Sequence, residues 1–152
     1  MKQGEGAVLA LPELEARDAA GVLLALASAA AAHIPGTVAE ELARRFRERE
    51  SLGSTAIGGG VALPHCRCPE TDRPLLLLAR SAAGVPFGAS DGAPIRLFVA
   101  VVTPAGSPAE HLRALAQLSR RLRDAERIAR LLAAQDAEAM LAAWQREADE
   151  AA

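Results

Sequence analysis

Aromatic residues are scarce in this sequence, which contains three Phe, one Trp and no Tyr among 152 residues. Apolar residues nevertheless make up 51% of the chain, and many of them are alanine. A substantial core is therefore available, and we expect it to be built from Leu, Val, Ile and Ala in contacts between helices and the sheet. The length suits one compact unit, so we expect a single domain over residues 1–152.

An excess of positive charge is also missing. The 17 Lys and Arg residues are outnumbered by 19 Asp and Glu residues, which gives a net charge of −2. Nucleic-acid-binding proteins usually carry a basic surface, and no Arg- or Lys-rich stripe with interleaved aromatic residues occurs here. The composition therefore argues against a nucleic-acid partner.

Cysteines and long apolar runs are few. Cys66 and Cys68 are the only cysteines. Two cysteines separated by one residue cannot cross-link a fold as the disulfides of small secreted proteins do. Residues 1–6 lack the basic and apolar regions of a secretion signal. The most membrane-like stretch, residues 19–34, is shorter than the ~20 residues that span a bilayer. We therefore expect a cytoplasmic chain that does not insert directly into the membrane.

Two helices are predicted in the N-terminal third. Asp18 is placed to cap a helix over residues 19–32, which ends before a Pro-Gly pair. Thr37 and Glu40 have the spacing of a capping box at the start of the next helix. The apolar face of that second helix contains Val38, Leu42 and Phe46 and continues to an arginine, Arg49. The pattern therefore predicts that Arg49 points inward.

The centre of the chain alternates between apolar strands and polar loops. Residues 75–79 form a continuous apolar run, as expected for a strand covered on both faces, and residues 95–102 form the clearest strand. A short strand is expected over residues 61–63, just before Pro64 and His65. Glycine, proline and polar residues predict loops over residues 53–60, 66–74 and 82–94.

The C-terminal part is predicted to be helical. Ser107 and Glu110 form a second capping box, with proline at the first helical position, and the helix continues to about residue 123. Its inward face holds His111 in the first turn, followed by Leu115, Leu118 and Leu122. Two further helices are expected over residues 126–134 and 137–146. Together these elements predict an α/β fold with helices packed on a sheet.

Two of the histidines are placed for chemistry. His65 ends a short strand after a glycine-rich loop, and strand ends are where ligands meet α/β proteins. His111 lies at a helix N-terminus, where free N–H groups and the helix dipole favour an anion. Arg49 adds a planar set of donors for phosphate oxygens. These residues predict a phosphoryl-binding site, in which a neutral imidazole is nucleophilic enough near pH 7 to accept the group.

The same residues have simpler interpretations. His65 and His111 could be histidines held by local hydrogen bonds, and Arg49 could be a surface residue of a charged helix end. The run His65-Cys66-Arg67-Cys68 invites a metal site, but structural zinc needs four ligands and no second ligand pair is present. The glycine run 58–60 lacks the Gly-Lys-Ser/Thr of a P-loop. We therefore expect no metal and no nucleotide cofactor.

One stretch carries a family resemblance. It reads Arg49-Glu50-x-x-Gly53-Ser54-Thr55-x-Ile57-Gly58-x-Gly60-Val61-Ala62-Leu63-Pro64-His65. This stretch resembles the signature of the fructose/mannitol/nitrogen-type IIA domains (EIIA type 2) of the bacterial sugar phosphotransferase system (PTS). Two further segments are similar to that family, namely Pro86-Phe87 with Asp91-Gly92-x-Pro94-Ile95, and Pro104 followed by His111-Leu112-x-x-Leu115. The likeness spans roughly residues 37–144.

The resemblance implies a three-layer α/β/α fold with a mixed central sheet, of the phosphotransferase–anion transporter-like type. It implies that His65 is phosphorylated by a small phosphocarrier protein such as HPr, that His111 and Arg49 contact the phosphate, and that Ser54 supports the site from its loop. The chain would then be a histidine phosphotransferase component that passes the group to a IIB domain for sugar transport. In nitrogen-type members, phosphorylation instead controls binding to regulatory target proteins. Neither activity needs a cofactor.

Three positions depart from the family pattern. Gly59 stands where asparagine is common, Cys66 stands where glycine often follows the histidine, and Gly88 replaces a common acidic residue. All three fall at the rim of the expected site and therefore bear on which partner docks there.

Overall fold

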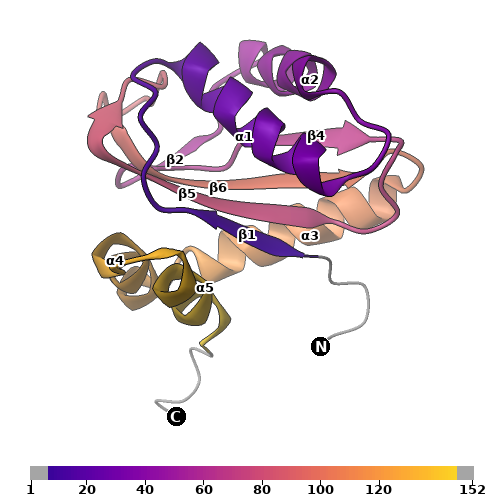
Figure 1. Ribbon diagram of the computed structural model, residues 1–152. Coiled ribbons are helices and arrows are strands. Elements are labelled where there is room, and N and C mark those ends of the chain that lie inside the picture. The colour runs from indigo at the N-terminus through magenta and orange to yellow at the C-terminus, as the bar shows by residue number, and fades with distance from the viewer. Residues whose placement is uncertain (1–6, 147–152) are drawn as a thin grey trace.

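The computed structural model describes residues 7–146, which form three layers (Figure 1). A six-stranded sheet lies between two groups of helices: α1 (Ala19–His33) and α2 (Ala39–Ser51) cover one face, and α3 (Pro108–Arg121), α4 (Ala125–Ala133) and α5 (Ala137–Gln145) cover the other. The predicted α/β/α fold is confirmed. Residues 1–6, which bear on the expected cytoplasmic location, and residues 147–152 lie outside the described part of the chain.

The sheet mixes parallel and antiparallel pairs, as predicted. Its strands are β1 (Val8–Leu11), β2 (Ala56–Gly58), β3 (Val61–Ala62), β4 (His65–Cys68), β5 (Leu75–Val85) and β6 (Ile95–Pro104). The order is β1-β5-β6-β3-β2, and β4 also pairs with β6, further along the edge that β3 occupies. Three pairs are parallel (β1/β5, β3/β6 and β4/β6), whereas β5/β6 and β2/β3 are antiparallel.

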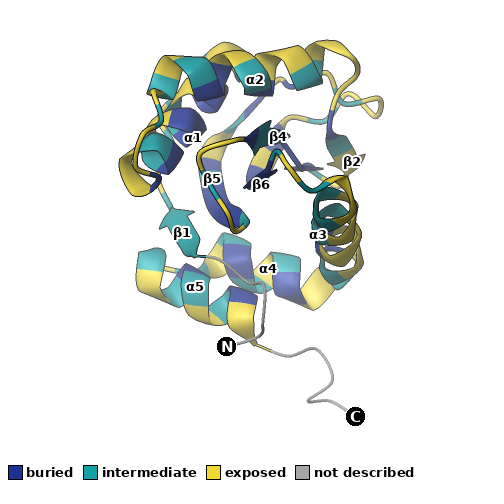
Figure 2. Cartoon of the chain, turned by 90° about the vertical axis from the view of Figure 1, so that its right-hand side faces the viewer, coloured by how far each residue is buried: buried dark blue, intermediate teal, exposed yellow. Residues whose placement is uncertain are grey.

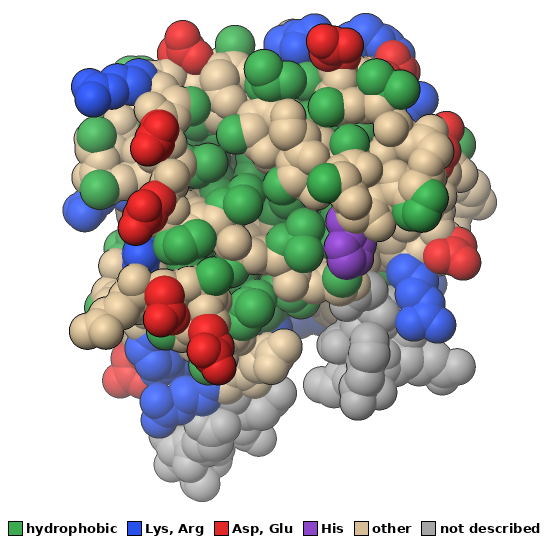
Figure 3. Space-filling model, in the orientation of Figure 1, with side chains coloured by type: hydrophobic (Ala, Val, Ile, Leu, Met, Phe, Trp, Pro, Cys, Tyr) green, Lys and Arg blue, Asp and Glu red, His purple; other side chains and the backbone are tan. Residues whose placement is uncertain are grey.

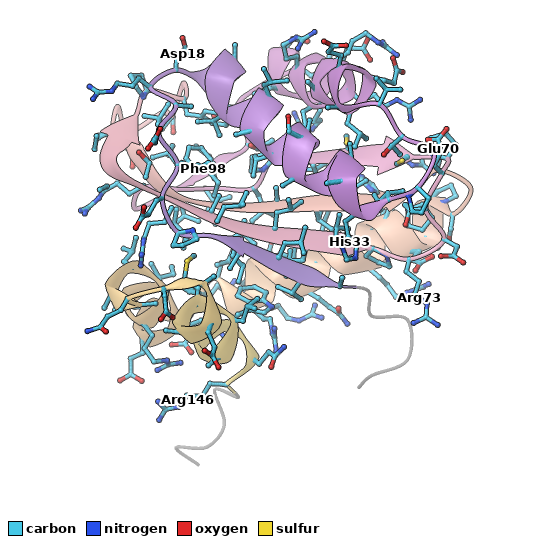
Figure 4. The ribbon with its side chains drawn as sticks, in the orientation of Figure 1. Asp18, His33, Glu70, Arg73, Phe98 and Arg146 are labelled. Atoms are coloured by element: carbon cyan, nitrogen blue, oxygen red, sulfur yellow. The ribbon has the colours of Figure 1, made fainter. Side chains whose placement is uncertain are left out.

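Each face of the sheet has its own apolar core. Toward α1 and α2, the core includes Leu26, Phe46 and Phe98, the last of which lies beneath α1 (Figure 4). Toward α3, α4 and α5, it includes Met140 and Trp144. In Figure 2 the buried residues of the helices face the sheet, while exposed residues face outward. Burial of each large apolar side chain contributes about 1.5–3 kcal/mol, so both cores stabilise the fold.

Two of the predicted helix starts are confirmed. Asp18, at the beginning of α1 (Figure 4), accepts a hydrogen bond from Gly21 N at 2.8 Å. Ser107 accepts from Glu110 N at 3.3 Å and is followed by a proline in the first turn of α3. These bonds satisfy backbone donors that the first turn of a helix leaves free.

The predicted capping box at the start of α2 is wrong. The Thr37 hydroxyl donates instead to the Ile34 carbonyl at 2.7 Å, and the N-cap residue is Val38, which makes no side-chain cap. The last carbonyl groups of a helix have no donor within the helix. Here one of them accepts from the Thr37 hydroxyl, which is therefore not available for the capping box. Val38 also leaves the predicted apolar stripe, because its side chain is 59% exposed.

The predicted loops over residues 53–60 and 66–74 are wrong in part. The first contains β2, which pairs with β3 through a turn of three consecutive positive-φ glycines, Gly58, Gly59 and Gly60. The second contains the end of β4, which pairs with β6. Both strands are short and gain their hydrogen bonds from partners that local composition does not reveal.

The structure also contains more strand than the sequence predicts. β1 has no counterpart among the predicted elements, and it pairs in parallel with β5. β5 continues past residue 79 into the predicted loop 82–94, and an irregularity lies between Arg80 and Val85. Within residues 7–146, no helix combines the length and apolarity needed to cross a membrane.

Candidate functional site

His65 is positioned by an interruption in the sheet. Pro64 lies between β3 and β4, and it has no N–H to donate to a ladder. Its carbonyl still accepts a hydrogen bond from Val101 N at 3.0 Å, which keeps the chain beside β6. His65 is therefore the first residue of β4 rather than the tip of the preceding strand. It pairs in register with Val101, whose side chain belongs to the core on the α3 side.

The hydrogen bonds of the His65 ring show which of its two nitrogens carries the proton. Nδ1 lies 2.8 Å from the carbonyl oxygen of Leu63, which can only accept, so Nδ1 carries the proton in the neutral ring. Nε2 is then unprotonated and accepts a hydrogen bond from Nε of Arg49 at 3.1 Å. The backbone thus leaves the Nε2 lone pair pointing at a guanidinium group.

Arg49 reaches this position from the last turn of α2. Its Nη1 donates to the Gly53 carbonyl at 2.9 Å, which ties the side chain to the following loop. The adjacent Glu50 holds the same loop, because its carboxylate accepts from the backbone N–H of Thr55 at 2.7 Å and from the Thr55 hydroxyl. The end of α2 therefore fixes both the guanidinium and the loop that leads toward His65.

His111 approaches from the opposite layer. It lies in the first turn of α3, and its ring centroid is 5.6 Å from that of His65, with the ring planes inclined at 55°. Nδ1 of His111 lies 2.5 Å from the hydroxyl oxygen of Thr103, a fully buried residue near the end of β6. The two imidazoles and Arg49 therefore meet at one place.

Both imidazoles are held in the neutral form. Burial lowers the pKa of His65 below its ordinary 6.5, and the charge of Arg49 lowers it further, against the opposing hydrogen bond to Leu63. Burial is also the main cause of the lowered pKa of His111, followed by His65 and then by Arg67. At neutral pH the site therefore combines unprotonated imidazole nitrogens with fixed arginine charge.

Ser54 lies next to this group rather than inside it. Its hydroxyl donates to the Phe87 carbonyl at 2.8 Å and accepts from Ala56 N at 3.1 Å. Its neighbour Gly53 is the residue that binds Arg49. Gly88, one of the three departures from the family pattern, follows Phe87. Its φ of 73° is a backbone conformation that favours glycine, so glycine suits this position.

The four candidate residues are thus brought into one region, with Arg49, His65 and His111 in direct proximity and Ser54 in the supporting loop. Sequence reasoning assigned no role to Glu50, Arg67 or Thr103. Glu50 lies within the recognised motif, and Thr103 is the first polar residue after a long apolar run, so both offered a weak signal. Their partners, however, depend on contacts between separate elements.

Other parts of the surface show different features. A hollow of about 410 Å³ lies between the end of α1 and the start of β5, and His33, Glu70 and Arg73 contribute to its lining (Figure 4). Figure 3 shows this side of the molecule, where hydrophobic side chains gather over α1 and β1. None of the four candidate residues lines the hollow. Within residues 7–146, no group of three His, Cys, Asp or Glu residues is arranged to hold a metal ion.

Comparison with known proteins identifies the family. The profile of the family described as "Phosphoenolpyruvate-dependent sugar phosphotransferase system, EIIA 2" matches residues 9–146. A nitrogen regulatory protein of Bradyrhizobium diazoefficiens is 37% identical over 130 residues, which cover 86% of this chain and 84% of that protein.

Solved structures agree in fold. Nitrogen regulatory protein IIA-Ntr of Neisseria meningitidis superposes with a TM-score of 0.80 at 24% identity, covering 91% of this chain and 92% of that one. The Escherichia coli complex of enzyme IIAMTL and phosphorylated enzyme IIBMTL contains a chain with a TM-score of 0.72 at 20% identity, covering 89% and 92%. From its three-layer fold and its sequence match along nearly the whole length, this chain belongs to the EIIA type 2 family of the phosphotransferase system.

Proposed function

We propose that this chain is a phosphoryl carrier that receives a phosphoryl group on Nε2 of His65. The donor is a phosphorylated histidine on an HPr-like phosphocarrier protein or its nitrogen-branch homologue, and the exchange takes place in the cytoplasm. The observation that supports this most directly is the tautomer of His65. Its Nδ1–H donates to the Leu63 carbonyl, so Nε2 has a lone pair, and this lone pair faces the guanidinium of Arg49.

The transfer balances without a metal or nucleotide. The N–P bond on the donor histidine breaks while a new N–P bond forms at Nε2 of His65, and the donor imidazole keeps the electron pair of the broken bond. Phosphoryl transfer passes through a loose transition state in which charge is spread over the phosphoryl oxygens, so positioning and charge stabilisation supply the catalysis. Arg49 would exchange its hydrogen bond to Nε2 for bonds to those oxygens.

The other candidate residues have supporting roles in this proposal. His111 would contact a phosphoryl oxygen from the far side of His65, since the rings are 5.6 Å apart at their centroids. Ser54 would maintain the loop whose Gly53 carbonyl anchors Arg49. A partly exposed site suits this chemistry, because the group arrives on one protein and leaves on another.

Labelling with phosphate tests the proposal. The purified chain is incubated with enzyme I, an HPr-type phosphocarrier and ³²P-phosphoenolpyruvate, and label is measured after separation. Wild type is expected to take up acid-labile label, and His65→Ala is expected to take up none, because the acceptor nitrogen is gone. His33→Ala removes an exposed histidine at the end of α1 and serves as the matched control. Equal labelling of wild type and His65→Ala would overturn the proposal.

The downstream step has two candidates. The first is transfer to a IIB domain for sugar transport. The second is regulation, in which added phosphate changes docking to a target protein, and the similarity to a nitrogen regulatory protein favours it. A phosphoryl group adds nearly two negative charges and three acceptor oxygens, which is sufficient to alter a docking surface. In the labelling experiment, chase of label onto an added IIB domain supports transport, whereas stable label with state-dependent target capture supports regulation.

A further inference from the structure

We infer that Thr103 is a positioning residue, which fixes the tautomer and orientation of His111 so that its Nε2–H is offered to the phosphoryl group on His65. The inference rests on the proposed function, and it assigns a role to a residue outside the family motif. Thr103 is fully buried near the end of β6, and its hydroxyl oxygen lies 2.5 Å from Nδ1 of His111.

Counting hydrogen atoms decides the direction of this bond. Among residues 7–146, Nδ1 of His111 is the one partner of the Thr103 hydroxyl. If Nδ1–H donated to the oxygen, the hydroxyl hydrogen would be buried without an acceptor, which is costly. If the hydroxyl donates to Nδ1, every hydrogen at this contact is used. Nδ1 is then the acceptor, and the neutral His111 ring carries its proton on Nε2.

The surrounding charge supports the same state. Arg67 lies on the same face of β4 as His65 and is the register partner of Thr103 on β6. Nη2 of Arg67 donates to the Ala105 carbonyl at 2.6 Å, in the loop that leads into α3. The arginine charge therefore lies beside His111, and it opposes protonation of the ring at a second nitrogen. In a doubly protonated His111 ring, Nδ1 could no longer accept a hydrogen bond from the Thr103 hydroxyl.

The two histidines are then complementary. His65 holds its proton on Nδ1 and presents a lone pair at Nε2, whereas His111 presents an Nε2–H. One ring can form the N–P bond while the other donates a hydrogen bond to a phosphoryl oxygen. A His111 ring in the opposite tautomer would direct a lone pair at an anionic oxygen, which is repulsive.

Imidazole nitrogen NMR of the unphosphorylated protein tests the inference directly. In wild type at pH 7.5, we expect the proton of His111 on Nε2 and a hydrogen-bonded, unprotonated Nδ1. Thr103→Val keeps the shape but removes the donor, so the Nδ1 signal should move and the ring signals should broaden. Thr103→Ser restores the hydroxyl and should restore the signals. Ser81→Ala, which removes another buried hydroxyl of the sheet, is the matched control.

The same variants are then assayed for phosphoryl acceptance. Thr103→Val should slow acceptance about tenfold, the effect of one lost hydrogen bond, whereas Thr103→Ser and Ser81→Ala should not. A wild-type His111 protonated at Nδ1 overturns the inference, and so does Thr103→Val with wild-type rate and ring signals. If Thr103→Val does not fold, the wild-type tautomer decides. If wild type accepts no phosphoryl group, the proposed function fails while the tautomer assignment is still measured.

Discussion

The strand β4 is four residues long, and its two faces, with two residues each, are chemically opposite. His65 and Arg67 are half-buried and face α3, whereas Cys66 and Cys68 are buried in the core beneath α1 and α2. Burial lowers the pKa of His65, because it disfavours the charged imidazolium, and raises the pKa of the Cys66 thiol to about 12, because it disfavours the thiolate. At neutral pH one face thus carries an available nucleophile and the other carries inert thiols.

The difference shows how strand alternation separates residues that are adjacent in sequence. The run His65-Cys66-Arg67-Cys68 has the composition of a ligand cluster, but successive side chains of a strand point to opposite faces. The imidazole and the Cys66 thiol therefore cannot share an ion without rebuilding the strand. The cysteines belong to the packing of the fold, and the histidine and arginine belong to the site.

The largest expected effect comes from placing a charge on the buried face. Cys68→Asp puts a carboxylate into the apolar core, beside the carboxylate of Glu70, which accepts from the Cys68 thiol at 3.3 Å. We expect a loss of about 3–5 kcal/mol in the free energy of unfolding, measured by urea denaturation. Cys68→Ala is the control, with a loss of about 1 kcal/mol. Equal stability of the two variants would mean that this face is not a dry core.

On the other face, the expected effect is on activity rather than on stability. Arg49→Gln removes the guanidinium beside Nε2 of His65, and we expect phosphoryl acceptance to fall about 100-fold, as when one transition-state donor is removed. The free energy of unfolding should change by about 1–2 kcal/mol at most, since two hydrogen bonds of a partly exposed side chain are lost, one to Gly53 and one to His65. Arg47→Gln, at an exposed position of the same helix, should retain the wild-type rate. Equal rates for the two variants would contradict the role of Arg49.

The smallest effect concerns pH. Because the pKa of His65 is lowered, the neutral ring of the folded protein should take up a second proton only at a pH below the ordinary pKa of 6.5. NMR titration of the unphosphorylated protein measures this. The unfolded chain binds that proton first, so this contribution to stability is present above pH 6.5 and is lost as the pH falls through the folded pKa. Arg49→Gln removes a positive neighbour and should raise the pKa of His65. A pKa that is unchanged or lower in that variant would contradict this effect of the guanidinium on the ring.

Much of the molecule follows from local sequence. Asp18 and Ser107 predict the starts of the helices that they cap. The apolar run over residues 95–102 predicts the strand that lies at the centre of the sheet. The stretch between Arg49 and His65 was sufficient to indicate the family. These features depend on periodicity, capping chemistry and a contiguous motif, all of which can be read along one segment.

Features that depend on distant partners could not be predicted in the same way. Thr37 satisfies the capping pattern, but its hydroxyl is taken by the carbonyl of Ile34 at the end of the preceding helix. β4 has a polar, loop-like composition, and it is a strand because its backbone pairs with that of β6. In both cases the outcome depends on competition for hydrogen bonds between segments, which no local pattern records.

By itself, the sequence determined the layered α/β fold, most of its helices and the identity of the residues proposed to carry phosphate. Only the tertiary structure decided which nitrogen of His65 is unprotonated, what holds His111 and which side of β4 faces the site. The reason is physical: a proton's location on a ring depends on the groups within about 3 Å of each nitrogen, and those groups come from separate parts of the chain.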